Sequence, residues 1–232
     1  MSINWKKTKR VARKVFLWLA VAILVVPVIL VLIFKWAPVR YTPLMMQRYM
    51  EGRADSKHAS QEWVDYDKIS PNLARAVISS EDNLFAKHSG FAFGEIRQAW
   101  LDSRKGKRLR GGSTISQQCA KNVFLPHSRS YIRKAYEAYF TVLIEWIWGK
   151  RRIMEVYLNV IEMGPGVYGA EAAAQKYFKV PASKLSQQQC ALIAACLPNP
   201  RKFLVAKPSA YIQQRQQKIL GLMPKMGKIE LE

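Results

Sequence analysis

The sequence predicts a mainly α-helical protein with one transmembrane helix near its N-terminus. The first observation is an apolar run without charge from Val15 to Phe34. The second is a series of helix start signals in the rest of the chain, among them Ser70 followed by Pro71 and two capping boxes. The third is that the alternation of apolar and polar residues typical of strands is nearly absent, so the remainder should be mostly helical.

The first 34 residues have the pattern of a membrane anchor. Residues 1–14 contain basic residues and no acidic ones, and residues 15–34 are long enough, at about 1.5 Å per residue, to cross a hydrocarbon core of roughly 30 Å. Pro27 is tolerated in such a helix as a kink. The positive-inside rule places the N-terminus in the cytoplasm and the chain after Lys35 outside the inner membrane, in a single pass. A cleaved signal peptide is the alternative, but the apolar run is longer than the usual stretch of about 7 to 15 residues.

The charge of the chain indicates an anionic partner. Lys and Arg number 37 against 16 acidic residues, a formal net charge of +21. Residues 1–40 hold 8 basic and no acidic residues, so the rest keeps 29 minus 16, or +13. Outside the cytoplasm this charge favours an anionic membrane surface or a lipid-linked phosphate. A location outside the cytoplasm argues against nucleic acid as the partner, and the sequence has no base-reading motif.

The length of 232 residues allows one sizeable domain besides the anchor. We expect residues 35–64 to form a membrane-proximal connector, residues 65–205 the main domain and residues 206–232 a basic helical tail. The apolar residues of the connector, such as Met46 and Tyr49, either pack on the core or dip into the lipid interface. Three cysteines lie among small or apolar residues, which predicts buried free thiols: Cys119, Cys190 and Cys196.

The stretch from Ile78 to Gly90 is the best candidate for an active-site segment. A helix is predicted from Pro71, with Ser70 at its N-cap, and it ends near Glu81 and Asp82. A carboxyl group near a helix C-terminus and apolar surface is disfavoured as an anion, which suits a general base or acid. The alternative is that both carboxylates are solvated charges at a helix end.

A second candidate segment begins at the glycine turn Gly111-Gly112. Thr114 and Gln117 form a capping box that opens a helix, after a helix predicted over residues 91–103 and a basic loop over residues 104–110. A glycine turn before a helix N-terminus presents N–H groups to an anion, and Lys121 adds positive charge. An ordinary capped helix is the alternative.

Three further helices complete the predicted domain. In the helix over residues 131–149, Arg133, Lys134 and Glu137 lie within one turn, where a local ion pair on a solvated face is the simple explanation. A helix over residues 150–163 precedes a turn with three glycines, from Gly164 to Gly169. Ser186 and Gln189 form another capping box before the last core helix.

Taken in series, these segments resemble the peptidoglycan glycosyltransferases. The first three motifs read Glu81-Asp82-x-x-Phe85-x-x-His88-x-Gly90, Gly112-Ser113-Thr114-x-x-Gln117-Gln118-x-x-Lys121-Asn122 and Arg133-Lys134-x-x-Glu137. The later blocks, from Lys150 to Asn159, from Gly164 to Ala173 and from Ala191 to Pro200, follow in the family's order. The resemblance covers roughly residues 65 to 205. Because the chain ends soon afterwards, it looks like the stand-alone, monofunctional type.

The resemblance implies a lysozyme-like helical domain at the inner membrane that polymerises lipid II into glycan strands with inversion and releases undecaprenyl diphosphate. It implies that Glu81 is the general base for the acceptor hydroxyl and that Glu137 helps to place the donor diphosphate. The remaining motif residues are implied to bind substrate: Asp82, Phe85, His88, Thr114, Gln117, Gln118, Lys121, Asn122, Arg133 and Lys134. Where the family has an acidic residue after Phe91, this chain has Ala92.

Cofactors and partners are implied by the same resemblance. Mg²⁺ or Mn²⁺ suits diphosphate oxygens, with Glu137 as the one candidate ligand, although the sequence has no self-contained metal site. The expected partners are lipid II, the growing glycan chain, the membrane and synthases or division proteins of the cell wall. The basic loop over residues 104–110 is expected to fold over the donor site. Two other classes remain, a lysozyme-like hydrolase and a non-catalytic scaffold that has kept the fold.

Overall fold

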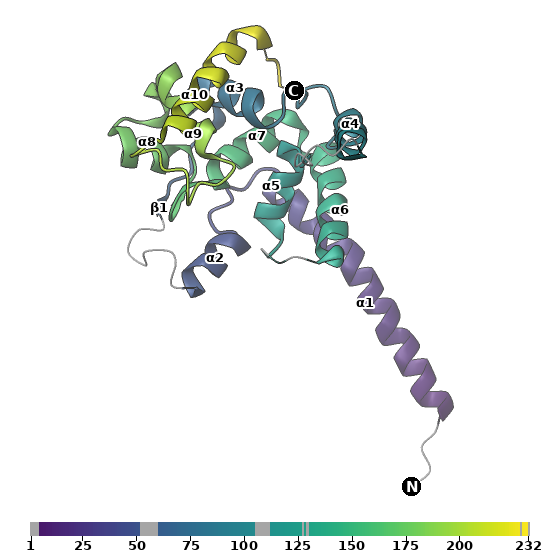
Figure 1. Cartoon of the computed structure of the whole chain (residues 1–232). Helices are drawn as coiled ribbons and strands as arrows, with labels where there is room; N and C mark the ends of the chain where they lie inside the picture. Colours follow the sequence, from purple (N-terminus) through teal and green to yellow (C-terminus); the bar gives the residue numbers. More distant parts are fainter. Residues whose placement is uncertain are drawn as a thin grey trace. The chain divides into compact units, whose positions relative to one another are not determined.

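The computed structural model confirms a mainly helical chain and describes residues 5–51, 60–104, 112–126, 128, 130–227 and 229–231. It separates into two compact units, Met1–Ala37 and Pro38–Glu232. The first unit contains helix α1 (Trp5–Phe34), whose apolar part, Ala12–Phe34, is long and apolar enough to span a membrane. Pro27 lies inside this helix, as predicted. The chain traced in Figure 1 runs from α1 into the helices of the second unit.

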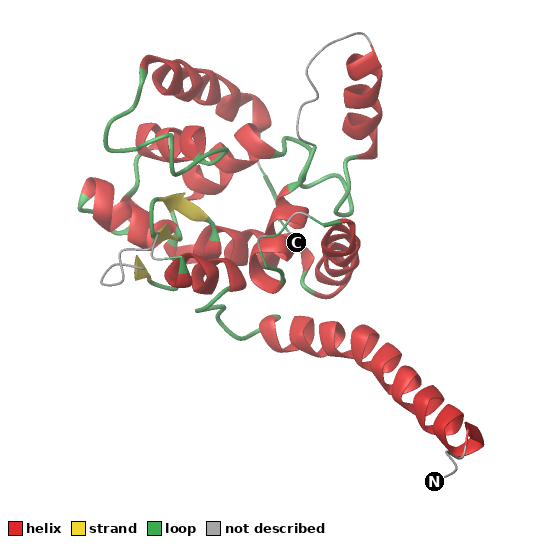
Figure 2. Ribbon diagram, turned by 60° about the horizontal axis from the view of Figure 1, so that its bottom comes forward, coloured by secondary structure: helices red, strands yellow, loops and turns green. Residues whose placement is uncertain are grey.

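The second unit is a body of helices with a very small sheet (Figure 2). Its helices are α2 (Pro43–Met50), α3 (Pro71–Glu81), α4 (Phe93–Arg104), α5 (Ile115–Phe124), α6 (Tyr131–Ile147), α7 (Gly149–Val160), α8 (Ala170–Phe178), α9 (Gln187–Cys196) and α10 (Ala210–Leu222). Single 3-10 turns are η1 (Tyr66–Lys68), η2 (Ala182–Lys184) and η3 (Met223–Met226). The strands are β1 (Ser60–Gln61), β2 (Glu162–Gly164) and β3 (Val167–Tyr168).

Two groups of helices make the core. In one group α5 packs on α6 and α7, and in the other α9 packs on α3 and α10. The helix starts follow the predicted signals, since both capping boxes form, with Thr114 before α5 and Ser186 before α9. Ser70 is the N-cap residue of α3, but its hydroxyl donates to the Leu185 carbonyl oxygen at 2.9 Å, so it ties α3 to the chain before α9.

The second unit is longer than the predicted main domain at both ends. Leu44 and Met45 of α2 are buried, and α10 contributes the buried Ile212 and Ile219. The apolar faces of both segments therefore belong to the core, which the polar composition of the connector and tail concealed. The expected basic loop lies outside the described residues from 105 to 110, so its position over the donor site stays a prediction.

The glycine turn after α7 is a small hairpin. Strand β3 pairs antiparallel with β2 and parallel with β1, in the order β1-β3-β2, with Ser60 opposite Val167. The predicted helix over residues 150–163 ends earlier, at Val160, because its last residues form β2. The side-chain amide of Asn159 donates to the Val64 carbonyl oxygen at 2.8 Å and so joins the hairpin region to the chain before α3.

Gly169, the N-cap of α8, is expected to tolerate no side chain. Its φ is +84°, and a Cβ atom built on it would lie 2.5 Å from the carbonyl oxygen of Asn159. We expect Gly169→Ala to lower the free energy of unfolding by roughly 1 to 3 kcal/mol, because backbone strain and a backbone clash add. Urea unfolding of the detergent-solubilised chain measures this. Gly94→Ala is the control, since a Cβ there meets no atom within 4 Å, and equal losses in both variants would contradict the explanation.

Candidate active site

A cleft with a volume of about 1130 Å³ lies in the second unit, and Glu81 is on its wall. The wall draws on α2, α3, α5, β2, α10 and the chain between α9 and α10. Among the described residues of its wall the charged ones are mainly basic, with Arg48, Lys121, Arg201, Arg215 and Lys218 against the acids Glu81 and Glu162. A cleft with this charge suits an anionic ligand.

Glu81 is the last residue of α3, and its side chain is 13% exposed. Its carboxylate accepts hydrogen bonds from the Ser80 hydroxyl and from Nε2 of Gln118, each at 3.2 Å. The guanidinium of Arg215 lies 3.6 Å away. The carboxylate is therefore held in a fixed orientation at the cleft wall while part of it stays accessible, which is what a general base needs.

Gln118 is itself oriented by a buried tyrosine. The Tyr157 hydroxyl donates to Oε1 of Gln118 at 3.2 Å, so the amide nitrogen of Gln118 points to Glu81. Burial raises the pKa of Tyr157 well above its ordinary value, and the nearby Glu81 carboxylate acts in the same direction. The tyrosine therefore stays neutral and donates. Tyr157 donates to Gln118, and Gln118 in turn donates to Glu81.

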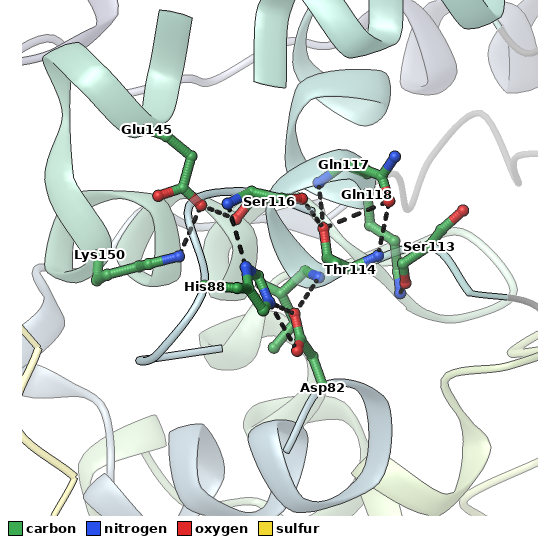
Figure 3. Close-up of polar contacts among 11 residues, drawn as sticks. Asp82, His88, Ser113, Thr114, Ser116, Gln117, Gln118, Glu145 and Lys150 are labelled. Atoms are coloured by element: carbon green, nitrogen blue, oxygen red, sulfur yellow. Dashed lines mark hydrogen bonds and ion pairs between the residues drawn. The ribbon is translucent and has the colours of Figure 1, made fainter. Parts of the chain in front are cut away.

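Asp82 is buried and has a different role from its neighbour. Its carboxylate accepts from the backbone N–H of Ile115 at 2.9 Å and lies 2.9 Å from Nε2 of His88. The N–H of Gly90 donates to Nδ1 of His88, so the proton of the imidazole is on Nε2, facing Asp82. Figure 3 shows Asp82 between His88 and the residues that begin α5.

The expected anion site at the N-terminus of α5 is therefore filled from within the protein. The Asp82 carboxylate accepts a hydrogen bond from the backbone N–H of Ile115. The side-chain oxygen of Gln117 accepts from the backbone N–H of Thr114, and the Thr114 hydroxyl accepts from the backbone N–H of Gln117. The sequence left an anion site and an ordinary capped helix both open, because local signals cannot show that the helix end meets a carboxylate 33 residues earlier in the chain.

Several predicted substrate residues are buried and support the wall of the cleft. Phe85 has no exposed surface, and Nζ of Lys150 lies 4.5 Å from the centre of its ring. Lys150 also pairs with Glu145 at 2.7 Å, and Glu145 accepts from the Ser116 hydroxyl (Figure 3). Asp82, Thr114 and Gln117 are likewise buried. These side chains fix the position of α3 against α5, whereas Gln118, Lys121 and Asn122 line the cleft.

The Glu137 group lies beside the cleft on α6 and is more buried than predicted. Glu137 is buried and accepts from Arg133 at 2.6 Å and from Lys134. Burial lowers the pKa of Lys121. The Glu137 carboxylate opposes this shift, and the positive charges of Arg133 and Lys134 add to it. Lys121 therefore connects this ion cluster electrostatically with the cleft. The local ion pair between Arg133 and Glu137 forms as the sequence predicts, but it lies on a buried face of α6 and not on a solvated one.

Five further charged residues line the cleft although no motif in the sequence marks them: Arg48, Glu162, Arg201, Arg215 and Lys218. Arg48 comes from the connector, Glu162 from the hairpin, Arg201 from the chain between α9 and α10, and Arg215 and Lys218 from the tail. Among the described residues, buried donors without a hydrogen-bond partner include Nε of Arg48, Nδ2 of Asn122 and Nε of Arg215. Three such donors around one cleft favour a ligand rich in acceptor oxygens. The local signal in the sequence for these residues is the spacing of Arg215 and Lys218, which lie three positions apart on one face of α10.

The three cysteines are free and buried, as predicted. Burial raises the pKa of the Cys190 thiol to about 12 and that of Cys196 to about 11. Cys119, on α5, has its pKa raised by burial as well. A thiol that is buried and protonated is a poor nucleophile, so these residues act in packing.

Comparison with known proteins matches most of the second unit to a known family. A family model described as transglycosylase matches residues 46–224, a range that begins within α2 and includes all of α10. The chain is 51% identical to a biosynthetic peptidoglycan transglycosylase of Bacteroides thetaiotaomicron over 97% of this chain and 91% of that protein. It is 50% identical to one of Caulobacter vibrioides (91% and 90% covered) and 42% identical to one of Shewanella oneidensis (96% and 97% covered).

Proposed function

The chain belongs to the transglycosylase family, and on that premise we propose that it is a glycosyltransferase that polymerises lipid II into glycan strands for cell-wall synthesis. The observation that carries the proposal is the Glu81 carboxylate, oriented by Gln118 and Arg215 on the wall of a basic cleft. A base in the cleft suits deprotonation of a sugar hydroxyl, and the surrounding cations suit a diphosphate leaving group.

In the proposed reaction, Glu81 removes the proton from the 4-hydroxyl of the acceptor sugar. That oxygen attacks the anomeric carbon of the donor, the bond to the diphosphate breaks, and the configuration inverts. Undecaprenyl diphosphate leaves with its negative charge offset by Lys121 and by Arg133 and Lys134 beside it. Asn122 supplies a further donor from the cleft wall. Asp82, Phe85, His88, Thr114 and Gln117 act as positioning residues.

The function is tested by incubating the detergent-solubilised full chain with labelled lipid II. We expect long glycan strands that lysozyme degrades, together with release of the lipid diphosphate. Lipid II that stays intact although it binds the protein would favour a non-catalytic scaffold. Cleavage of preformed glycan without polymer formation would favour the hydrolase.

The pH dependence of ligand binding should show whether the positive charge of Lys121 contributes to affinity. Because burial lowers its pKa, Lys121 loses its charge at a lower pH than an ordinary lysine, and affinity for a lipid diphosphate should fall as the pH rises. Lys121→Arg should keep the affinity on the alkaline side, since a guanidinium stays charged. Binding of fluorescent undecaprenyl diphosphate between about pH 7 and about pH 10 measures this. Lys225→Arg, outside the cleft, is the control, and identical curves for all three proteins would refute the role of Lys121.

The residues present do not fit a metal ion held by Glu137. Both carboxylate oxygens are engaged by Arg133 and Lys134, and the described part of the chain has no group of three or more acidic, histidine or cysteine ligands. We expect the ratio of polymer yield with and without Mg²⁺ to be the same in the wild type and in Glu137→Gln, measured on labelled lipid II. A ratio that changes in the variant would assign the ion to Glu137.

We also propose that α1 anchors the enzyme in the inner membrane with the N-terminus in the cytoplasm and the second unit outside. The support is the basic, acid-free segment 1–14 before an apolar helix that could span the bilayer. The lipid-linked substrate and the growing strand would then meet the cleft at the membrane, where cell-wall synthases and division proteins also act. Protease treatment of spheroplasts tests the orientation, because only an outward domain is digested.

A further inference from the structure

A second group of charged residues lies on the wall of the cleft, on elements other than the helix that carries Glu81. Arg48 comes from α2, Glu162 from β2 and Arg201 from the chain between α9 and α10. Tyr168 of β3 is paired with Glu162 across the hairpin. The positive charges of both arginines act on Glu162 and on Tyr168, so the two arginines converge on the same pair of residues. We call these four residues the Glu162 group.

The donors of the Glu162 group are only partly satisfied within the protein. The side chain of Arg201 makes no hydrogen bond or ion pair with another described residue. Arg48 pairs with Glu51 through Nη1 at 3.1 Å, but its Nε is buried and has no partner in the described part of the chain, and neither has the buried hydroxyl of Tyr168. A cluster that serves only the fold normally satisfies its own polar atoms, as the partners of Glu137 do. The open donors of this group therefore indicate a ligand site.

The acid of the group limits the charge of the ligand. Glu162 is buried, and the backbone N–H of Gly166 stabilises its carboxylate. Burial nevertheless raises the pKa of Glu162, although this N–H and the two arginines oppose the shift. A carboxyl group that takes up a proton more readily repels an anion less than an ordinary glutamate does. Two guanidinium ions beside such a group can hold one negative charge, whereas a diphosphate, with its greater charge, is repelled more strongly.

The chemistry of lipid II offers one kind of singly charged anion. In the proposed reaction the diphosphate is met by Lys121, with Arg133 and Lys134 beside it, and the two sugars carry no charge. The remaining negative charges of lipid II are the carboxylates of its stem peptide. A guanidinium holds a carboxylate through two parallel hydrogen bonds, which fix direction as well as charge.

We propose that the Glu162 group binds a carboxylate of the stem peptide of lipid II and so selects the substrate by its peptide; the identity of this ligand rests on the proposed function. Arg201 is the residue that contacts the carboxylate, because its side chain has no partner within the domain. Arg48 adds the second positive charge from α2. The cleft would then recognise three parts of one substrate: the sugar hydroxyl at Glu81, the diphosphate at Lys121 and the peptide at the Glu162 group.

The test compares two synthetic lipids in the detergent-solubilised full chain. One is complete lipid II, and the other is the same molecule with every peptide carboxylate converted to a carboxamide, which removes the charge and keeps the size. Each lipid carries a fluorophore, and binding is followed by anisotropy in a Glu81→Gln background that slows turnover. We expect the dissociation constant to be about tenfold higher for the amidated lipid, the loss typical of one charge-assisted hydrogen bond.

Replacing Arg201 by Gln should bring the ratio of the two dissociation constants close to one, because only the complete lipid loses a contact. The fold should be retained, since Arg201 makes no internal bond, and thermal unfolding checks this. Arg201→Lys should give an intermediate ratio, because it keeps the charge without the planar fork. Lys202→Gln is the matched control, since it removes a positive charge from an exposed neighbour that is not part of the cleft wall, and it should keep the ratio of the unsubstituted background.

Equal affinity of the unsubstituted background for the two lipids would overturn the proposal. So would a loss of affinity for both lipids by the same factor in Arg201→Gln, because the group would then bind the diphosphate or a sugar. Polymerisation by the wild type separates this inference from the proposed function. Polymer made from both lipids with equal KM and equal affinity would refute the peptide site alone. If no polymer forms, the proposed function fails, while the ratio of dissociation constants still decides whether the Glu162 group binds the peptide.

Discussion

Replacing Glu81 by Gln should lower the rate of lipid II polymerisation by about two to four orders of magnitude, which is the usual contribution of a general base. Gln keeps the size of the side chain and an acceptor oxygen for Ser80 or Gln118, but it cannot take the proton of the acceptor hydroxyl. Because Glu81 lies at the end of α3 and is partly exposed, the fold should be retained. Initial rates with labelled lipid II, together with thermal unfolding, measure both effects.

Asp65→Asn is the matched control for this experiment, because it removes one carboxylate that is 61% exposed and pairs with the nearby Lys68. It should keep the activity of the wild type. If Glu81→Gln polymerises lipid II at the rate of Asp65→Asn while both remain folded, Glu81 is not the base, and the proposed mechanism falls even though the family assignment stands.

Asp82→Ala should cause the largest loss of stability among single changes near the cleft. The substitution leaves two buried donors without an acceptor, the backbone N–H of Ile115 and the Nε2–H of His88. Each unsatisfied buried donor costs roughly 1 to 3 kcal/mol, so the free energy of unfolding should fall by about 2 to 5 kcal/mol. Polymerisation should fall as well, because Asp82 holds the end of α3, and with it Glu81, against α5.

Asp82→Asn separates hydrogen bonding from the simple loss of a side chain. Asn keeps one acceptor oxygen, which can still take the N–H of Ile115, so its loss of stability should be smaller than that of Asp82→Ala. Urea unfolding of the detergent-solubilised chains provides the comparison. Stability within about 0.5 kcal/mol of the wild type for Asp82→Ala, the range usual for surface changes, would show that the contact does not hold α3 and α5 together.

Local signals in the sequence predicted the elements well. The two capping boxes mark the starts of α5 and α9, because a cap is an interaction within a few residues. Ser70-Pro71 marks the start of α3, where the fixed φ of Pro71 suits the first helical position although Ser70 makes no side-chain cap bond. The apolar run of α1 was equally clear, since crossing a bilayer needs only length and composition. The boundary after α7 was less clear, because a three-residue strand such as β2 has no periodicity to detect.

The sequence by itself determined the helical class, an apolar helix long enough to span a membrane, the basic charge and, through motifs in series, the family and Glu81 as its candidate base. Only the tertiary structure decided what each carboxylate faces. Glu81 and Asp82 are adjacent in the chain, yet Glu81 lies on the cleft wall and Asp82 is buried at the start of α5. Likewise, Arg215 reaches Glu81 from a helix 134 positions later. Contacts between distant segments depend on packing, and local composition and periodicity carry no information about which segments will meet.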